Sequence, residues 1–193
     1  MKLNLGAGNK VIDGYLNVDK YPTATTDLVI DLEKTPWPWE TGSVTHAAFI
    51  HSLEHMGRDT DTFLAIMREL YRVCAHGAQI TVHVPHPRHD NFLGDPTHVR
   101  PITPQMLTLF DRQKNDAWVA GGISAATPLA HYIGVDFVIA DLNTILDPVY
   151  YELYSQGKLD IDELNQRARE MNNVIAEYHI TLVARKEAPA GVA

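Results

Sequence analysis

The chain has 193 residues, which is enough for one ordinary domain and too few for two full enzyme domains. Hydrophobic residues make up 45% and charged residues 21%, and this balance excludes a disordered or collagen-like chain. The 16 Lys and Arg residues stand against 24 Asp and Glu residues, and the net charge of −8 disfavours a nucleic-acid partner because phosphates attract positive charge. The single cysteine excludes a disulfide framework and a cysteine-based zinc site.

Apolar stretches along the chain are short. None approaches the roughly 20 residues that a membrane-spanning helix needs, so we expect no membrane partner. The N-terminal Met-Lys-Leu-Asn-Leu-Gly turns polar at once, which predicts the absence of a signal peptide. We therefore expect a soluble, cytoplasmic protein; its oligomeric state is unknown at this point.

Strand-like segments recur from the N-terminus to the C-terminus. They are short runs of apolar or β-branched residues, and several end directly at a glycine or a polar side chain. The predicted strands are Lys2–Leu5, Tyr15–Val18, Asp27–Ile30, Val44–Ile50, Gln79–Val84, Asp136–Leu142 and Tyr178–Arg185.

Helical periods fill several of the longer intervals between these strands. The clearest covers Thr60–Cys74, and His76-Gly77 is expected to end it. Arg112–Tyr132 has little period and predicts a loop or a broken helix. The other predicted helices are Thr103–Phe110, a short one that opens at Asp147-Pro148, and one from Asp160 to about Val174.

Strands separated by helices predict an α/β fold with a mostly parallel sheet covered on both faces. We expect a single domain over residues 1–186. The last residues, 187–193, are rich in Ala, Pro and Gly and are expected to form a flexible tail.

Three consecutive strand ends carry groups that suit a nucleoside-containing ligand. The first strand runs into Gly6-Ala7-Gly8, where the missing Cβ atoms let a ligand approach the backbone. Asp19 ends the second strand and can accept hydrogen bonds from ribose hydroxyls. Asp31 and Leu32 follow the third strand and could hold an adenine amino group and its ring face. Each feature is also compatible with a simple turn, but together they favour a binding site at this edge of the sheet.

In their order along the chain, these motifs resemble the class I S-adenosylmethionine-dependent methyltransferases. The resemblance covers about residues 2–110 and implies a Rossmann-like seven-stranded sheet whose last strand is antiparallel and lies beside the fifth. The chain departs from the family because only Asn9–Asp13 lie between Gly8 and Gly14, where a helix usually follows a longer glycine turn. The matching segments are Leu-Asn-Leu-Gly-Ala-Gly (3–8), Gly-Tyr-Leu-Asn-Val-Asp (14–19), Asp-Leu (31–32), Ile-His-Ser-Leu-Glu-His-Met (50–56) and Glu-Leu-Tyr-Arg-Val-Cys-Ala-His-Gly-Ala-Gln-Ile (69–80).

The resemblance also implies an enzyme. The implied activity is O- or N-methylation of a small-molecule substrate, by in-line displacement, with S-adenosylmethionine as the cofactor. His51, at the end of the fourth strand, would border the sulfonium and the substrate. The cofactor-binding residues that the resemblance implies are Gly6, Gly8, Asp19, Asp31, Leu32 and Ile50.

A histidine-rich loop follows the fifth strand and is expected to lie over the same edge of the sheet. In one interpretation His86, His89 or His98 is a general base for a hydroxyl acceptor, since imidazole titrates near neutral pH. In a second, two or three of these histidines bind a divalent metal together with Asp90 or Asp95. In a third, they are ordinary loop and capping residues.

A second polar set, His51, Glu54 and His55, lies at the end of the fourth strand. His51 and His55 would share one face of a helical turn, although Glu54 and His55 could equally complete a turn and a cap. The candidate catalytic residues are therefore His51, His86, His89 and His98, and the predicted site includes no metal.

Two other functions are compatible with this pattern. A metal-dependent hydrolase could use the His and Asp side chains of the loop 83–98, but it has no need of a ribose-binding carboxylate at Asp19. A non-catalytic member of the same fold could bind the cofactor without transferring the methyl group, because a fold does not by itself determine activity.

Overall fold

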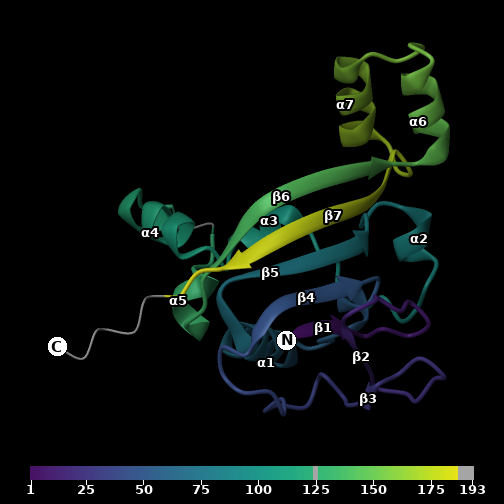
Figure 1. Cartoon of the computed structure of the whole chain (residues 1–193). Helices are drawn as coiled ribbons and strands as arrows, with labels where there is room; N and C mark the ends of the chain where they lie inside the picture. The colour runs from purple at the N-terminus through teal and green to yellow at the C-terminus, as the bar shows by residue number, and fades with distance from the viewer. Residues whose placement is uncertain (124–125, 187–193) are drawn as a thin grey trace.

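A single mixed sheet organises the computed structural model, which describes residues 1–123 and 126–186 (Figure 1). The strands follow the order β3 (Leu28–Val29), β2 (Leu16–Asp19), β1 (Lys2–Leu5), β4 (Val44–Ile50), β5 (Cys74–Pro85), β7 (Ile175–Ala184) and β6 (Phe137–Leu146). The first five strands are parallel, whereas β7 is antiparallel to both of its neighbours, β5 and β6. This topology confirms the predicted Rossmann-like sheet and its antiparallel last strand.

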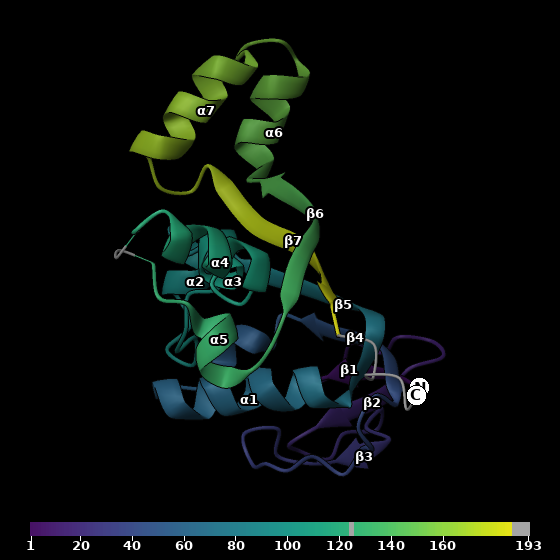
Figure 2. The ribbon, with the colours of Figure 1, turned by 90° about the vertical axis from the view of Figure 1, so that its left-hand side faces the viewer.

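Helices gather on one side of the sheet. Figure 2 shows α1, α3, α4 and α5 together on that side. Among the described residues, the connections 6–15 and 20–27 contain no helix, so loops replace the helices that would cover the other side near β1, β2 and β3. The helices of the body are α1 (Thr60–Val73), α2 (Asp90–Leu93), α3 (Pro104–Thr108), α4 (Arg112–Ala120) and α5 (Leu129–Ile133).

The core lies between the sheet and α1. Phe63, Ile66 and Leu70 of this helix are buried in the same cluster as Phe49 of β4 and Ile80 of β5. Burial of each such side chain stabilises the fold by about 1.5–3 kcal/mol relative to exposure. Because this cluster extends beneath β1 and β4, it fixes the strand ends that carry the predicted site.

The first helix covers almost its predicted range, but the predicted stop signal, His76-Gly77, is wrong. The helix ends at Val73, and the backbone is already extended at Cys74. His76-Gly77 belong instead to β5, where a bulge separates the Val44–Cys74 pair from the pairing of β4 at Gln79. The strand can include this bulged segment because Gly77, which has no Cβ atom, adopts a φ of +75° without steric strain.

Other segments also depart from their predicted lengths: β6 continues to Leu146 rather than Leu142, and β7 begins at Ile175 rather than Tyr178. The third strand shrinks to two residues, and α7 (Ile161–Glu170) ends before Val174. The stretch 112–132 contains α4 and the start of α5, with residues 124–125 outside the described part. The predicted tail, residues 187–193, also lies outside it.

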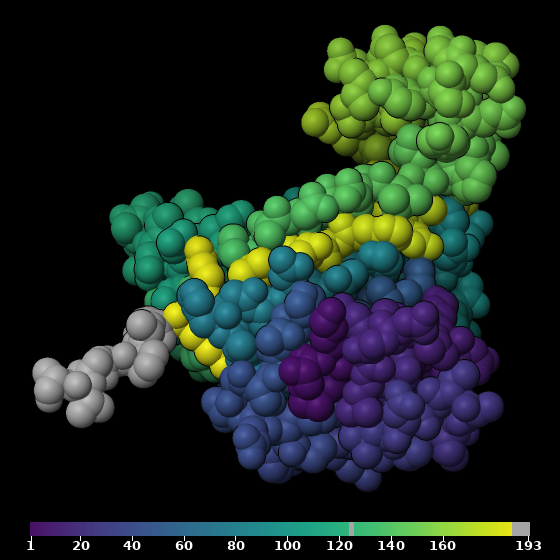
Figure 3. Space-filling model, viewed as in Figure 1, coloured from purple at the N-terminus to yellow at the C-terminus, as the bar shows by residue number. Residues whose placement is uncertain are grey.

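A helical hairpin, α6 (Pro148–Ser155) and α7, connects β6 to β7 and projects from the carboxyl edge of the sheet (Figures 1 and 3). Asp147 caps α6 as predicted, and Asp160 opens α7 in a capping box with Glu163. Over residues 1–123 and 126–186, none of the helices combines the length and apolar character that crossing a bilayer requires.

Arg185 links the end of β7 to α4, and its loss should be costly. Its Nη2 atom lies 2.6 Å from Asp111 Oδ1 and 2.7 Å from Asp136 Oδ1. We expect Arg185→Ala to lower the free energy of unfolding by roughly 3 kcal/mol, because Asp111 is buried and would keep an unpaired charge. Urea unfolding at pH 7 measures the change, with Arg68→Ala, an exposed position on α1, as the control. Equal losses in the two variants would contradict the expectation.

Candidate functional site

A pocket of about 500 Å³ opens at the carboxyl ends of β1 to β4. Its volume falls within the range of about 300–1,000 Å³ that is usual for small-molecule sites. The pocket lies where the strand order reverses between β1 and β4, the usual position of a ligand in an open α/β sheet. The predicted residues that line it are Gly6, Gly8, Asp19, Asp31, Leu32 and His51.

The glycine turn after β1 brings the backbone close to its neighbours. Gly6 has a φ of +75°, and a Cβ atom built on it would lie 2.5 Å from the Cβ atom of Ser52. The Ser52 hydroxyl donates to the carbonyl of Leu5 at 2.6 Å, and the Gly6 N–H donates to the carbonyl of Val18 at 2.9 Å. These contacts tie the ends of β1, β2 and β4 together, and they leave no room for a side chain at Gly6.

Asp19 is fixed at the end of β2 by two backbone donors. The N–H of Gly8 donates to Oδ2 at 2.8 Å, and the N–H of Tyr21 donates to Oδ1 at 2.9 Å. A carboxylate has about four lone-pair sites, so each oxygen can accept a further hydrogen bond. The side chain is therefore oriented in advance for a ligand with two neighbouring hydroxyls.

Asp31 lies beside Lys20 in the same pocket. Lys20 Nζ is 3.2 Å from Asp31 Oδ2, and the N–H of Glu33 donates to Oδ1. Burial raises the pKa of Asp31, but the hydrogen bonds from Lys20 and Glu33 outweigh it and hold the pKa below its usual value. Asp31 is thus an ionised acceptor for an amino group. Leu32 is buried next to it.

His51 follows β4 in a backbone conformation that is unusual for a residue with a side chain. Its φ is +53°, and its N–H donates to the carbonyl of His83 at 2.9 Å. The imidazole lies between two carboxylates, with Nδ1 3.8 Å from Glu54 Oε1 and Nε2 3.5 Å from Glu177 Oε2. Burial lowers the pKa of His51, so the ring is neutral at physiological pH and can accept a proton.

His86 and His89 lie at the base of the helical hairpin. The N–H of Asn91 donates to His89 Nδ1, which leaves His89 Nε2 as the donor to Asp147 Oδ2 at 3.2 Å. His86 accepts from the N–H of Arg88, and its ring lies 5.0 Å from that of Tyr178. Both rings are buried, and neither belongs to the pocket lining in the part of the chain that the structure describes.

His98, in contrast, approaches the pocket. Val99 and Arg100 donate their N–H groups to the carbonyl of Glu54, which holds this end of the loop against the turn after β4. The His98 ring consequently lies 4.6 Å from that of His55, a pocket residue. Within the described residues, the side chains grouped closely enough to hold a metal ion are Glu54, His55 and His98, so the structure separates His98 from the other two loop histidines.

Some pocket residues were absent from the predicted site. Thr97 lines the pocket beside His55, although only its neighbour His98 was a candidate. Its signal in the sequence is the Asp-Pro-Thr-His turn, in which Asp95 accepts from the Thr97 hydroxyl at 2.6 Å. Ile50, which was predicted to bind the cofactor, is partly buried at the end of β4 and lies outside the lining among the described residues.

Comparison with known proteins shows the fold. No protein-family model and no curated protein matches the chain. Among solved structures, a methyltransferase from Archaeoglobus fulgidus that depends on S-adenosylmethionine (SAM) is similar with a TM-score of 0.59 and 16% identity, over 96% of this chain and 85% of the other. A SAM-dependent methyltransferase from Methanosarcina mazei is similar with a TM-score of 0.54 and 13% identity, over 96% of this chain and 92% of the other.

A third similar structure holds two small molecules. It is the 1,6-didemethyltoxoflavin-N1-methyltransferase of Burkholderia thailandensis with 1,6-didemethyltoxoflavin and S-adenosylhomocysteine bound. Its TM-score is 0.52 at 10% identity, over 96% of this chain and 71% of the other. Together with the strand order, these structures show that the chain has the class I SAM-dependent methyltransferase fold.

Proposed function

We propose that the protein is a SAM-dependent methyltransferase that acts on a small molecule. The observation that carries this proposal is the convergence of Gly6, Asp19 and Asp31 on one pocket, at the edge where this fold binds ligands. Two separate carboxylates are the acceptors that a ribose diol and an adenine amino group require. The similarity to a methyltransferase with a bound small-molecule acceptor supports the same substrate class.

The residues present fit this cofactor. Gly6 and Gly8 offer bare backbone to the methionine part, and a Cβ atom at Gly6 would collide with Ser52. Asp19 keeps free lone pairs for the two ribose hydroxyls, and Asp31 with the buried Leu32 suits the adenine edge and face. Gly6, Gly8, Asp19, Asp31 and Leu32 are therefore the residues that we propose to hold it.

When bound, S-adenosylmethionine supplies a methyl group on a positively charged sulfur. The protein's own contribution is to align an acceptor with that group. His51 lies at the pocket wall with a neutral imidazole, so it can take the proton from an acceptor hydroxyl. An amine acceptor would need alignment alone.

We place His86 and His89 in a supporting role, because their ring nitrogens form hydrogen bonds with Arg88, Asn91 and Asp147.

Calorimetric titration with S-adenosylhomocysteine tests the proposal. We expect the wild type to bind and Asp19→Ala to bind at least about tenfold more weakly, because each hydrogen bond to a charged group contributes roughly 1.5–3 kcal/mol. Asp13→Ala is the matched control, since Asp13 is an exposed aspartate in the same loop region. A folded wild type that does not bind S-adenosylhomocysteine would refute the proposal, and so would equal affinities in the three proteins.

A further inference from the structure

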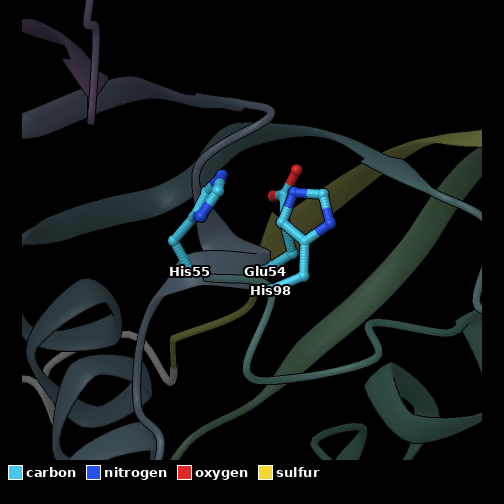
Figure 4. A group of neighbouring side chains, drawn as sticks. All are labelled: Glu54, His55 and His98. Carbon is cyan, nitrogen blue, oxygen red and sulfur yellow. The ribbon is translucent and has the colours of Figure 1, made fainter. Parts of the chain in front are cut away.

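We propose that Glu54, His55 and His98 bind a divalent first-row transition-metal ion at the border of the pocket. Figure 4 shows these three side chains facing a common space. Each offers one ligand atom, and the three atoms lie within 4.8 Å of one another. Glu54 and His55 belong to the turn after β4, whereas His98 comes from the loop after β5, so the fold brings together ligands that are far apart in the sequence.

The burial of Glu54 is the first argument for a cation. Its side chain is 1% exposed, and neither carboxylate oxygen has a hydrogen-bond partner. A buried carboxylate is costly unless a positive charge or several donors compensate it. His51 Nδ1 lies 3.8 Å from Glu54 Oε1, beyond hydrogen-bond distance, so it does not compensate the carboxylate. A metal ion bonded to Glu54 would do so.

The hydrogen bonds of the two histidines are the second argument. His98 Nδ1 lies 3.0 Å from the carbonyl of Phe92, so it must carry the proton and donate it. The Thr97 hydroxyl donates to Asp95 at 2.6 Å, and Thr97 Oγ1 therefore accepts from His55 Nδ1 at 2.9 Å. In the neutral form of each ring, Nε2 is therefore the nitrogen without a proton and is free to bind a metal ion. Metal-ligating histidines show this arrangement, in which the second nitrogen is fixed by an outer hydrogen bond.

The ligand set indicates the kind of ion. Two imidazole nitrogens and one carboxylate suit Zn²⁺, Fe²⁺, Co²⁺, Ni²⁺ or Mn²⁺, and three protein ligands leave positions open for a substrate. Tetrahedral bonds of about 2.0–2.2 Å require ligand atoms about 3.4 Å apart, so binding needs the ligand atoms to approach one another by up to about 1.4 Å. His55 is exposed and can supply this movement. Asp95 Oδ2, 3.8 Å from His98 Nε2, is available as a further ligand.

The role of the ion rests on the proposed function. His55 and Thr97 both line the pocket, so the open positions of the ion border the space for the acceptor. Coordination would lower the pKa of an acceptor hydroxyl, and His51 would take the released proton. The oxygen lone pair would then form a bond to the methyl carbon while the carbon–sulfur bond breaks and its electron pair goes to sulfur. The substrate class is therefore a small molecule with a hydroxyl that can bind a metal.

Titration of the full chain with Co²⁺, after dialysis against a chelator, tests the site through the visible absorption of the bound ion. We expect one Co²⁺ per chain in the wild type, and at least about tenfold weaker binding in Glu54→Gln and His98→Ala. Thr97→Val should weaken binding about tenfold, because His55 loses the partner that fixes its tautomer. His131→Ala is the matched control, since His131 forms an exposed pair with Asp116 at 2.8 Å and should bind as the wild type does.

Each variant is also titrated with S-adenosylhomocysteine, which separates this proposal from the previous one and confirms folding. Binding of S-adenosylhomocysteine without uptake of Co²⁺ by the wild type would overturn the metal site alone. Equal Co²⁺ affinity in the wild type, Glu54→Gln and His98→Ala would overturn it as well. Uptake of Co²⁺ that depends on both Glu54 and His98 supports the metal site, whether or not the wild type binds S-adenosylhomocysteine. Failure of the wild type to bind S-adenosylhomocysteine would refute only the role of the metal ion in methyl transfer.

Discussion

Replacing Glu54 by glutamine should stabilise the metal-free protein at pH 8 by roughly 3 kcal/mol. Burial raises the pKa of this carboxyl from 4.5 to about 7 in the folded protein. Ionisation is therefore free of cost in the unfolded chain and costly in the folded one. The penalty is absent below pH 4.5, develops as the pH rises to about 7, and is complete at pH 8. Glutamine keeps the shape of the side chain and carries no charge at any pH.

Urea unfolding in the presence of a chelator, at pH 4.5 and pH 8, measures this gain. Glu69→Gln is the matched control, because Glu69 is also buried but is bonded to Arg72 and to the N–H of Trp37. The hydrogen bond from Arg72 lowers the pKa of Glu69, so its ionised form stabilises the fold above pH 4.5. Glu69→Gln should therefore destabilise the protein at pH 8. A loss of stability in Glu54→Gln at pH 8 would contradict the account of that site.

The second large effect concerns Gly6. We expect Gly6→Ala to lower the free energy of unfolding by about 2–5 kcal/mol and to weaken S-adenosylhomocysteine binding at least about tenfold. Alanine at this position has two costs, a left-handed backbone at φ +75° and a Cβ atom 2.5 Å from that of Ser52. Any shift that relieves the collision moves the ends of β1 and β4, between which the pocket opens.

Gly14→Ala separates these two costs. Gly14 has a φ of +78°, but a Cβ atom there meets nothing within 4 Å. We expect this variant to lose only about 1–2 kcal/mol and to keep its affinity for S-adenosylhomocysteine. Thermal or urea unfolding and calorimetry on the two variants provide the comparison. Similar losses in both would show that backbone strain, rather than the close approach of Ser52, makes glycine necessary at Gly6.

The histidine-rich loop combines two roles in space. At its start, His89 bonds to Asp147, Arg88 donates to the carbonyls of Ala168 and Arg169, and Asn173 accepts from the N–H of Asp90. These contacts attach the helical hairpin to the edge of the sheet. At its end, residues 97–100 fold back against Glu54 beside the pocket. The loop thus couples the position of the hairpin to the wall of the candidate site.

The sequence by itself determined the alternation of strands and helices and the first half of the candidate site, whereas the seven-stranded order with its antiparallel last strand was implied only by the family resemblance. Alternating strands and helices, with a glycine turn and two aspartates at successive strand ends, are local patterns, and parallel strands necessarily bring their carboxyl ends to one edge. Gly6, Asp19 and Asp31 could therefore be placed together before any coordinates were known. The helix stop at Gly77 could not, because the pairing of β5 with β4 overrides a local signal.

Only the tertiary structure decided which histidines belong to the pocket. His86, His89 and His98 are equivalent in the sequence, but a hydrogen bond to Asp147, 58 positions away, holds the second at the hairpin. Backbone hydrogen bonds from Val99 and Arg100 to Glu54 bring the third to His55. The burial of Glu54 is likewise invisible locally, since a turn residue is ordinarily exposed. Burial and proximity depend on long-range packing, and the chemistry of this carboxylate and its two histidine neighbours follows from them.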